Sequence, residues 1–324
     1  MTLEMDWFKS ARIVAKIPYP PVSAWEFRQL KTEEAVRERL RASTVYILAQ
    51  RPMLWFENVL VTDEAITFEI NDGQGPAVKG RIEPIQIGLA KLGESLFVEG
   101  GFHHDAANLP PPWNKAASLK VFDADGDLKV WWSPQKLLYE AINKDLQVQF
   151  AGDATRFMAF EIHYIGKTKD LFKRMKAHAK YQDILIHERI RGEGHAQPSL
   201  EITLFTLEIT NLEEGASVRI GPDPDDIEVP PIVFRLPNDP SDPKVRAFAR
   251  QWANKKSKAA TTELEAWLIN MFKPEHNETL FDNYPFITGG LRDLNYSFTD
   301  LTINNCPYVF RTQKGGTPLD EPDE

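Results

Sequence analysis

Alternating hydrophobic and polar residues dominate the first part of the chain, which is the pattern of half-buried β-strands. Short runs rich in β-branched and aromatic residues occupy 44–50, 57–61 and 65–70, with turn-forming residues between them. The segment 199–210 (SLEITLFTLEIT) alternates over a longer stretch. We therefore predict a mostly β N-terminal region and one long strand in the second half of the chain.

Helical patterns are fewer. A charged segment at 31–43 has Thr32 as its expected N-cap, and the segment 133–143 opens with Ser-Pro, a combination that favours a helix start. Two further helices are expected near the C-terminus: a basic one at 244–258, and an apolar one at 262–272 that a proline ends.

A stiff proline-rich segment at 108–113 (NLPPPW) marks the expected domain boundary. We predict a mostly β N-terminal domain at 1–113, a core at 114–311 and a polar, disordered tail at 312–324. The acidic, proline-rich stretch at about 211–258 is interpreted as an insertion into the core. These elements favour an α+β fold class.

The composition is that of an ordinary globular protein. Hydrophobic residues make up 42% and charged residues 26% of the 324 positions, and no apolar run approaches the roughly 20 residues that span a bilayer. The N-terminus lacks the basic and apolar regions of a secretory signal. Cys306 is the single cysteine, which excludes a disulfide framework and a cysteine-built zinc site. The cytoplasm is the expected compartment.

One stretch reverses the acidic charge of the whole chain, which is -9. The segment 161–180 (EIHYIGKTKDLFKRMKAHAK) opens as an apolar strand, turns at Gly166 and continues as a helix. From Lys167 to Lys180 it contains six Lys or Arg residues and one Asp. Such a local reversal is typical of a site for an anion, most often phosphate, and a solvated helix face is the alternative.

The same stretch carries residues known from a nuclease family. The segment YIGKTKDLFKRMKAH resembles the second half of the GIY-YIG nuclease signature, and ELEAWLINMFKPEHN resembles that family's closing helix. Tyr164 lies ten residues before Arg174, as in the family, and Glu265 lies twelve residues before Asn277, as in its DNA-repair branch. A tyrosine or histidine often follows the arginine by one helical turn, which here is His178.

The resemblance implies a small mixed sheet with flanking helices and a metal-dependent endonuclease, a hydrolase whose partner is nucleic acid, DNA more than RNA. The implied cofactor is Mg²⁺ or Mn²⁺ on Glu265, because a hard cation needs few carboxylates and many waters. Arg174 and Lys167 would contact the scissile phosphate. Tyr164 or His178 would orient the attacking water.

The remaining implied roles are supporting ones. Asn277 would hold the local geometry, and Lys173 and Lys176 would add contacts to the substrate. The N-terminal region would select the substrate or bind a protein partner. For such a site to work, Arg174 and Glu265 must lie in one small hollow.

One part of the signature is missing from its usual place. The family's first strand carries a tyrosine about ten residues before Tyr164, where this chain has Ala154. We expect the missing strand at 129–132 (KVWW) or at 146–150 (LQVQF). Tyr139 is nearby, but its position on a predicted helix makes it a poor substitute.

Other interpretations of these residues stay open. Thr262 and Glu265 have the spacing of a capping box, in which the glutamate binds the start of its own helix. If no group replaces the missing tyrosine, the chain is a catalytically inactive nucleic-acid-binding or regulatory module on the same scaffold. A pure protein-interaction scaffold is the third possibility.

Overall fold

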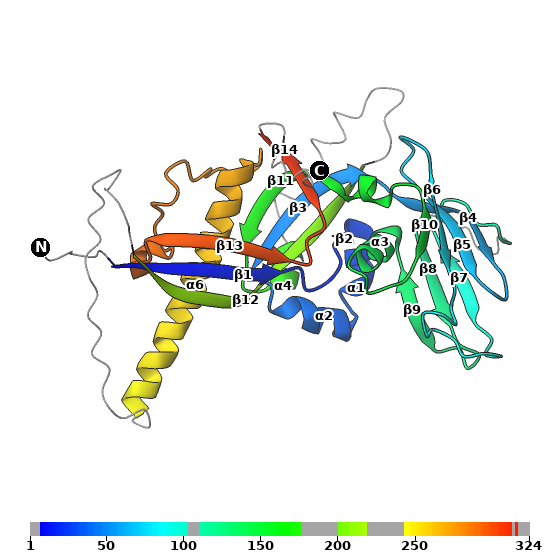
Figure 1. The fold of residues 1–324 in the computed structure, drawn as a ribbon, viewed down its shortest axis with the longest axis horizontal. Coiled ribbons are helices and arrows are strands. Elements are labelled where there is room, and N and C mark those ends of the chain that lie inside the picture. The colour runs from blue at the N-terminus through cyan, green and yellow to red at the C-terminus, as the bar shows by residue number, and fades with distance from the viewer. Residues whose placement is uncertain (1–6, 103–109, 177–199, 219–242, 313–314, 317–324) are drawn as a thin grey trace, which may run out of the picture.

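The computed structural model describes residues 7–102, 110–176, 200–218, 243–312 and 315–316. Its main feature is an eight-stranded sheet in the order β13-β1-β12-β3-β11-β14-β15, with β2 pairing against β12 (Figure 1). The strands are β1 (Trp7–Lys16), β2 (Val22–Ser23), β3 (Val45–Pro52), β11 (Ala159–Lys167), β12 (Leu200–Val218), β13 (Phe298–Asn304), β14 (Val309–Thr312) and β15 (Gly315–Gly316).

Two smaller sheets lie together at one end of the molecule, at the right of Figure 1. One has the order β10-β6-β5-β4 and the other the order β7-β8-β9. Their strands are β4 (Trp55–Val61), β5 (Ile66–Asn71), β6 (Val78–Ile82), β7 (Phe97–Gly101), β8 (Ser118–Phe122), β9 (Leu128–Trp132) and β10 (Gln149–Ala151). All of them lie in the chain between β3 and β11, which are neighbours in the large sheet.

The prediction of an α+β fold built on a small mixed sheet with flanking helices is wrong. The structure is mostly β, and its large sheet takes strands from both ends of the chain. The length of β12 explains the difference. This strand continues to Val218, so it pairs with β3 along Leu200–Leu207 and with β1 along Glu208–Val218. The sheet therefore grows well beyond the size that the resemblance implied.

The expected boundary at residue 113 is not where the sheets divide. Strands β1 and β3 come from the expected N-terminal domain, yet they pair with β12 and β11 of the expected core. The expected insertion at 211–258 contains the end of β12 and the first half of a long helix, and its residues 219–242 lie outside the described residues. In the expected tail, Gly315–Gly316 pair with β14.

Helices cover both faces of the large sheet. They are α1 (Ala24–Leu30), α2 (Glu34–Arg41), α3 (Pro134–Ile142), α4 (Leu171–Lys176) and α6 (Pro243–Phe272). The Ser133 hydroxyl caps α3 by accepting from the Lys136 amide, as the Ser-Pro start predicts. The N-cap of α2 is Glu33, because the Thr32 hydroxyl donates to the Gln29 carbonyl instead. Within the described ranges, no helix has the length and apolar character needed to cross a membrane.

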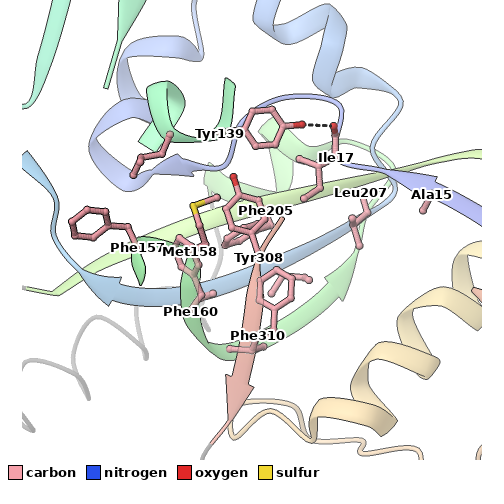
Figure 2. Close-up of a cluster of buried hydrophobic side chains, with 14 of the residues drawn as sticks. Ala15, Ile17, Tyr139, Phe157, Met158, Phe160, Phe205, Leu207, Tyr308 and Phe310 are labelled. Carbon is pink, nitrogen blue, oxygen red and sulfur yellow. Dashed lines mark hydrogen bonds between the residues drawn. The ribbon is translucent and has the colours of Figure 1, made fainter. Parts of the chain in front are cut away.

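Two hydrophobic clusters occupy the two faces of the large sheet. The larger one joins the sheet to α6, and Phe205 makes edge-on ring contacts there with Phe160, Tyr308 and Phe310 at centroid distances of 4.8, 5.0 and 5.0 Å (Figure 2). The smaller one contains Tyr46 and is covered by α1, α2 and α4. Because side chains alternate along a strand, consecutive residues of β3 belong to different clusters.

A buried ionic group ties β3 to β12. The Arg51 side chain donates from Nε and Nη2 to Glu201 Oε1 at 3.3 and 3.2 Å, and from Nη1 to the Phe157 carbonyl at 2.7 Å. Its guanidinium also lies over the Phe160 ring, 4.7 Å from the centroid. The second carboxylate near this arginine is Glu26, which is buried and accepts from the Ser23 amide at 2.5 Å.

Burial disfavours the charged form of both carboxyls. It raises the pKa of Glu201 to about 7, although the Arg51 charge acts in the opposite direction. It also raises the pKa of Glu26, against hydrogen bonds from Ser133 and Ser23. The folded state therefore binds these protons more tightly than the unfolded state, in which a glutamate keeps its ordinary pKa of 4.5.

The first prediction follows from the raised pKa of the two carboxyls. The stability contributed by the two protonated carboxyls is present below pH 4.5 and is lost as the pH rises toward about 7. Glu26→Gln keeps a neutral acceptor for the Ser23 amide, so we expect it to raise the free energy of unfolding at pH 8 relative to pH 5 and to flatten the decline with pH. Urea denaturation at pH 5 and pH 8 measures both effects, with the exposed Glu64→Gln as control. Destabilisation at pH 8 with an unchanged decline would contradict the assignment.

Candidate active site

The strand beside the Tyr-Ile-Gly sequence is β3, from near the start of the chain. It runs antiparallel to β11, and the pairing places Tyr46 opposite Gly166 and Val45 opposite Lys167. A register irregularity lies between Ile162 and Tyr164. The aromatic hydroxyl next to the Tyr-Ile-Gly sequence therefore comes from Tyr46.

Both segments expected to supply the missing strand lie elsewhere. Residues 129–132 belong to β9, which pairs with β8, and residues 146–150 lead into β10, which pairs with β6. Both strands therefore belong to the smaller sheets, which are formed by the part of the chain between β3 and β11. Tyr139 lies on α3, as predicted, and its hydroxyl donates to the Ile17 carbonyl at 3.2 Å (Figure 2).

Tyr46, Tyr164 and Arg174 form one cluster on the face of the sheet that α4 covers. Arg174 Nε donates to the Tyr46 hydroxyl at 3.2 Å, and the two tyrosine rings lie 6.0 Å apart between centroids. Hydrogen bonds to Tyr46, and to a lesser extent to Tyr164, raise the pKa of Arg174. Burial raises the pKa of Tyr46 above its ordinary value of 10, so this phenol stays neutral at physiological pH.

Gly166 allows this close approach. A Cβ atom at this position would lie 2.7 Å from the Tyr46 hydroxyl oxygen and 2.7 Å from a ring carbon of Tyr164. Neither ring can move away easily, because Tyr46 is fully buried and both rings pack against the smaller cluster. The glycine is therefore required by the two tyrosines.

The short helix α4 holds Arg174 in place. The Lys173 amide donates to Asp170 Oδ1 at 3.0 Å, and the Asp170 amide donates to the Thr168 hydroxyl at 3.1 Å, which fixes the turn after β11. Leu171 is buried in the smaller cluster. The Phe172 ring stacks on Phe27 of α1 at a centroid distance of 5.5 Å. These contacts leave the Arg174 side chain on the exposed side of the helix.

Lys167 and Glu265 form an ion pair on the opposite face, where α6 packs against β11. Lys167 Nζ lies 2.6 Å from Glu265 Oε2 and donates to the Thr262 hydroxyl at 3.4 Å. The Glu265 side chain is 13% exposed, and the lysine is 43% exposed. The capping-box interpretation is wrong, because α6 begins at Pro243 and Thr262 lies in its interior. Lys167 is the partner that a carboxylate on this apolar helix requires.

Asn277 completes the free edge of β11. Strand β14 pairs with β11 only along Ala159–Glu161, which leaves the backbone of the following residues without a strand partner on that side. The Asn277 side chain accepts from the Ile165 amide at 2.9 Å and donates to the Ile165 carbonyl at 2.8 Å. The His276 amide donates to the His163 carbonyl at 3.1 Å. The loop after α6 thus acts as a short strand for β11.

The predicted residues come together at the end of β11 in two groups. Tyr164 and Arg174 lie on one face, and Lys167 and Glu265 lie on the other. The expectation that Arg174 and Glu265 share one small hollow is wrong. They belong to two groups on opposite faces of the sheet, on either side of the consecutive residues Gly166 and Lys167, which are about 3.8 Å apart between Cα atoms.

The other predicted residues have supporting positions or are outside the described chain. Lys173 is exposed beside Arg174, and Lys176 is the last residue of α4. His178 lies outside the described residues. Sequence reasoning missed Tyr46, although it predicted a strand at 44–50; the distance of more than a hundred residues between Tyr46 and Tyr164 concealed their contact.

Glu265 is the metal ligand that the sequence predicts. In the described ranges, no three His, Cys, Asp or Glu side chains gather in an arrangement that could hold a metal ion. Glu265 Oε2 is paired with Lys167. One carboxylate, completed by water and phosphate oxygens, is an arrangement that Mg²⁺ accepts.

Comparison with known proteins adds no relative. No protein-family model, no curated protein and no solved structure matches this chain.

The second prediction concerns the contact at Gly166. Gly166→Ala should destabilise the fold by about 1–3 kcal/mol, because the new methyl group would overlap Tyr46 and Tyr164. Urea denaturation measures the loss, and the near-ultraviolet circular dichroism of the tyrosines should change with it. The control is Gly215→Ala, whose methyl group would meet only the Ser10 hydroxyl. Equal stabilities of the two variants would show that the tyrosines do not need this glycine.

Proposed function

We propose that this protein is a metal-dependent nuclease that hydrolyses nucleic-acid phosphodiester bonds through a GIY-YIG-type site at the end of β11. The observation that carries the proposal is the hydrogen bond from Arg174 Nε to the Tyr46 hydroxyl at 3.2 Å. It joins the arginine of the signature helix to a tyrosine on the strand beside the Tyr-Ile-Gly sequence. Lys167 and Glu265 lie next to this group.

In this proposal Arg174 neutralises charge on the scissile phosphate. A guanidinium presents donors in a fixed plane, so its value depends on its orientation. The Tyr46 hydroxyl fixes that orientation, and its raised pKa means that it acts as a neutral hydrogen-bonding group and not as a base. Orientation or deprotonation of the attacking water is left to Tyr164 or His178.

Lys167 and Glu265 supply the second half of the chemistry. Glu265 would hold Mg²⁺ or Mn²⁺, which stabilises charge on the phosphoryl and leaving oxygens when bound. Lys167 balances the carboxylate at 2.6 Å and is exposed enough to reach a phosphate oxygen. A phosphodiester lying across the end of β11 would meet Arg174 on one side and Lys167 on the other, which is how two adjoining groups would serve one phosphate.

The inactive-module alternative rests on the missing GIY tyrosine and on the acidic total charge of the chain. The hydroxyl of Tyr46, opposite Gly166, supports the enzyme over this alternative. We therefore favour the enzyme, and propose DNA over RNA as its substrate and the cytoplasm as its compartment.

The third prediction tests the activity. Purified protein incubated with Mg²⁺ or Mn²⁺ should cleave DNA, and Glu265→Gln should reduce the rate by about a hundredfold or more, because it removes the carboxylate that would hold the ion. Glu64→Gln, which changes a carboxylate that is 87% exposed in the smaller sheets, should leave cleavage unchanged. DNA and RNA should both be tested, each in single-stranded and in double-stranded form. Cleavage that survives in the Glu265→Gln protein would remove this assignment.

The fourth prediction separates positioning from base catalysis. Tyr46→Phe should lower kcat by about tenfold to a hundredfold, the effect of losing one hydrogen bond to a charged group, with little change in KM. The pH–rate profile should keep its shape, because the Tyr46 phenol stays neutral and does not titrate over the pH range of the profile. Tyr139→Phe removes a buried hydroxyl contact elsewhere and serves as control. Loss of the acidic limb of the profile would make Tyr46 the base.

A further inference from the structure

The first half of α6 extends beyond the part of the helix that packs in the core. Ala259, Ala260 and Leu264 are buried, whereas the described side chains from Gln251 to Lys258 are exposed apart from Lys256. Figure 1 shows this part of the helix, in yellow, projecting past β12 and away from the sheet. The core of the protein therefore does not account for these helical turns.

An ionic contact joins this part of the helix to the sheet. Lys256 Nζ donates to both carboxylate oxygens of Glu214 on β12, at 2.9 and 2.8 Å. Lys9 of β1 lies 3.4 Å from the same carboxylate. The helix is thus held against the end of the long β1–β12 ribbon, and its other positions remain outside this contact.

The charge of this segment is strongly one-sided. Residues 243–261 contain six cationic residues and no acidic one, in a chain whose net charge is -9. The cationic positions are Lys244, Arg246, Arg250, Lys255, Lys256 and Lys258. A solvated helix gains stability from opposite charges three or four residues apart, and like charges at that spacing cost stability. An anionic partner that binds a helix with only positive charges therefore stabilises it.

The basic segment continues directly into the proposed active site. Lys258 lies seven residues before Glu265, which places it about 10 Å along the helix and about 20° around it. Lys255, three residues earlier, lies about 80° from Glu265 around the axis. Both side chains are exposed. Anionic groups bound along this helix would therefore lie within about 10–30 Å of a phosphate at Glu265.

We propose that residues 243–258 of α6 enter the major groove of duplex DNA beside the cleavage site, an inference that rests on the proposed nuclease function. The major groove of B-form DNA admits an α-helix, with phosphates on both sides of it. The major groove of A-form RNA is too deep and narrow for this. The cationic positions are spread around the helix at 100° per residue, which fits two rows of phosphate and not the single polar face of a membrane-surface helix.

The experiment measures binding without catalysis. The Glu265→Gln protein, in EDTA, is titrated against a 30-base-pair DNA duplex, the same sequence as RNA duplex, and anionic phospholipid vesicles, at several salt concentrations. The variant carries Lys244→Gln, Arg246→Gln, Arg250→Gln and Lys258→Gln in addition; Lys256 is kept for its contact with Glu214. The matched control carries Lys79→Gln, Lys91→Gln, Lys115→Gln and Lys144→Gln, four exposed lysines in the part of the chain between β3 and β11.

Each outcome decides the proposal. We expect the variant to bind duplex DNA at least about thirtyfold more weakly at 100 mM salt and to lose about three to four units of the slope of log K against log salt, while the control keeps both. Equal affinity for RNA duplex, binding to vesicles in place of DNA, or an unchanged slope in the variant would overturn it. The binding experiment does not depend on catalysis. If the protein binds duplex DNA through α6 but does not cleave it in Mg²⁺, this inference stands and only the proposed nuclease activity is rejected.

Discussion

The antiparallel pairing of β3 with β11 is the constraint on which the candidate site depends. It brings residues from near the start of the chain to the middle of the chain and sets Tyr46 opposite Gly166. A shift of one residue in this register would turn Tyr46 toward the larger cluster and Val45 toward the smaller one. Because consecutive residues of β3 are buried in different clusters, burial itself fixes the register.

The backbone hydrogen bonds of β11 determine which groups lie next to the candidate site. A buried strand edge needs partners for its amides and carbonyls, and β14 covers only the first residues of this edge. Asn277 covers Ile165 with two hydrogen bonds. The buried side chains of α6 pack against the same strand, and Glu265 of this helix lies 2.6 Å from Lys167.

Charge is distributed unevenly in this acidic chain. Cationic residues gather after Gly166 and along the first half of α6, and the Lys167–Glu265 pair joins β11 to the second half of that helix. The part of the chain between β3 and β11 forms its own sheets at the far end of the molecule (Figure 1). The inserted sheets are therefore separate from both cationic segments.

Local patterns by themselves determined part of this protein: the strands at 44–50 and 65–70 and the cap of α3. These depend on periodicity and on residues close in sequence, so the sequence contains them. Only the tertiary structure decided that Tyr46 is the neighbour of Gly166, that Lys167 is the partner of Glu265, and that the helices at 244–258 and 262–272 are one. The first of these outcomes depends on which strands pair across more than a hundred residues. Backbone hydrogen bonds are the same for every strand, so they do not distinguish one partner from another. Local sequence therefore does not encode the choice.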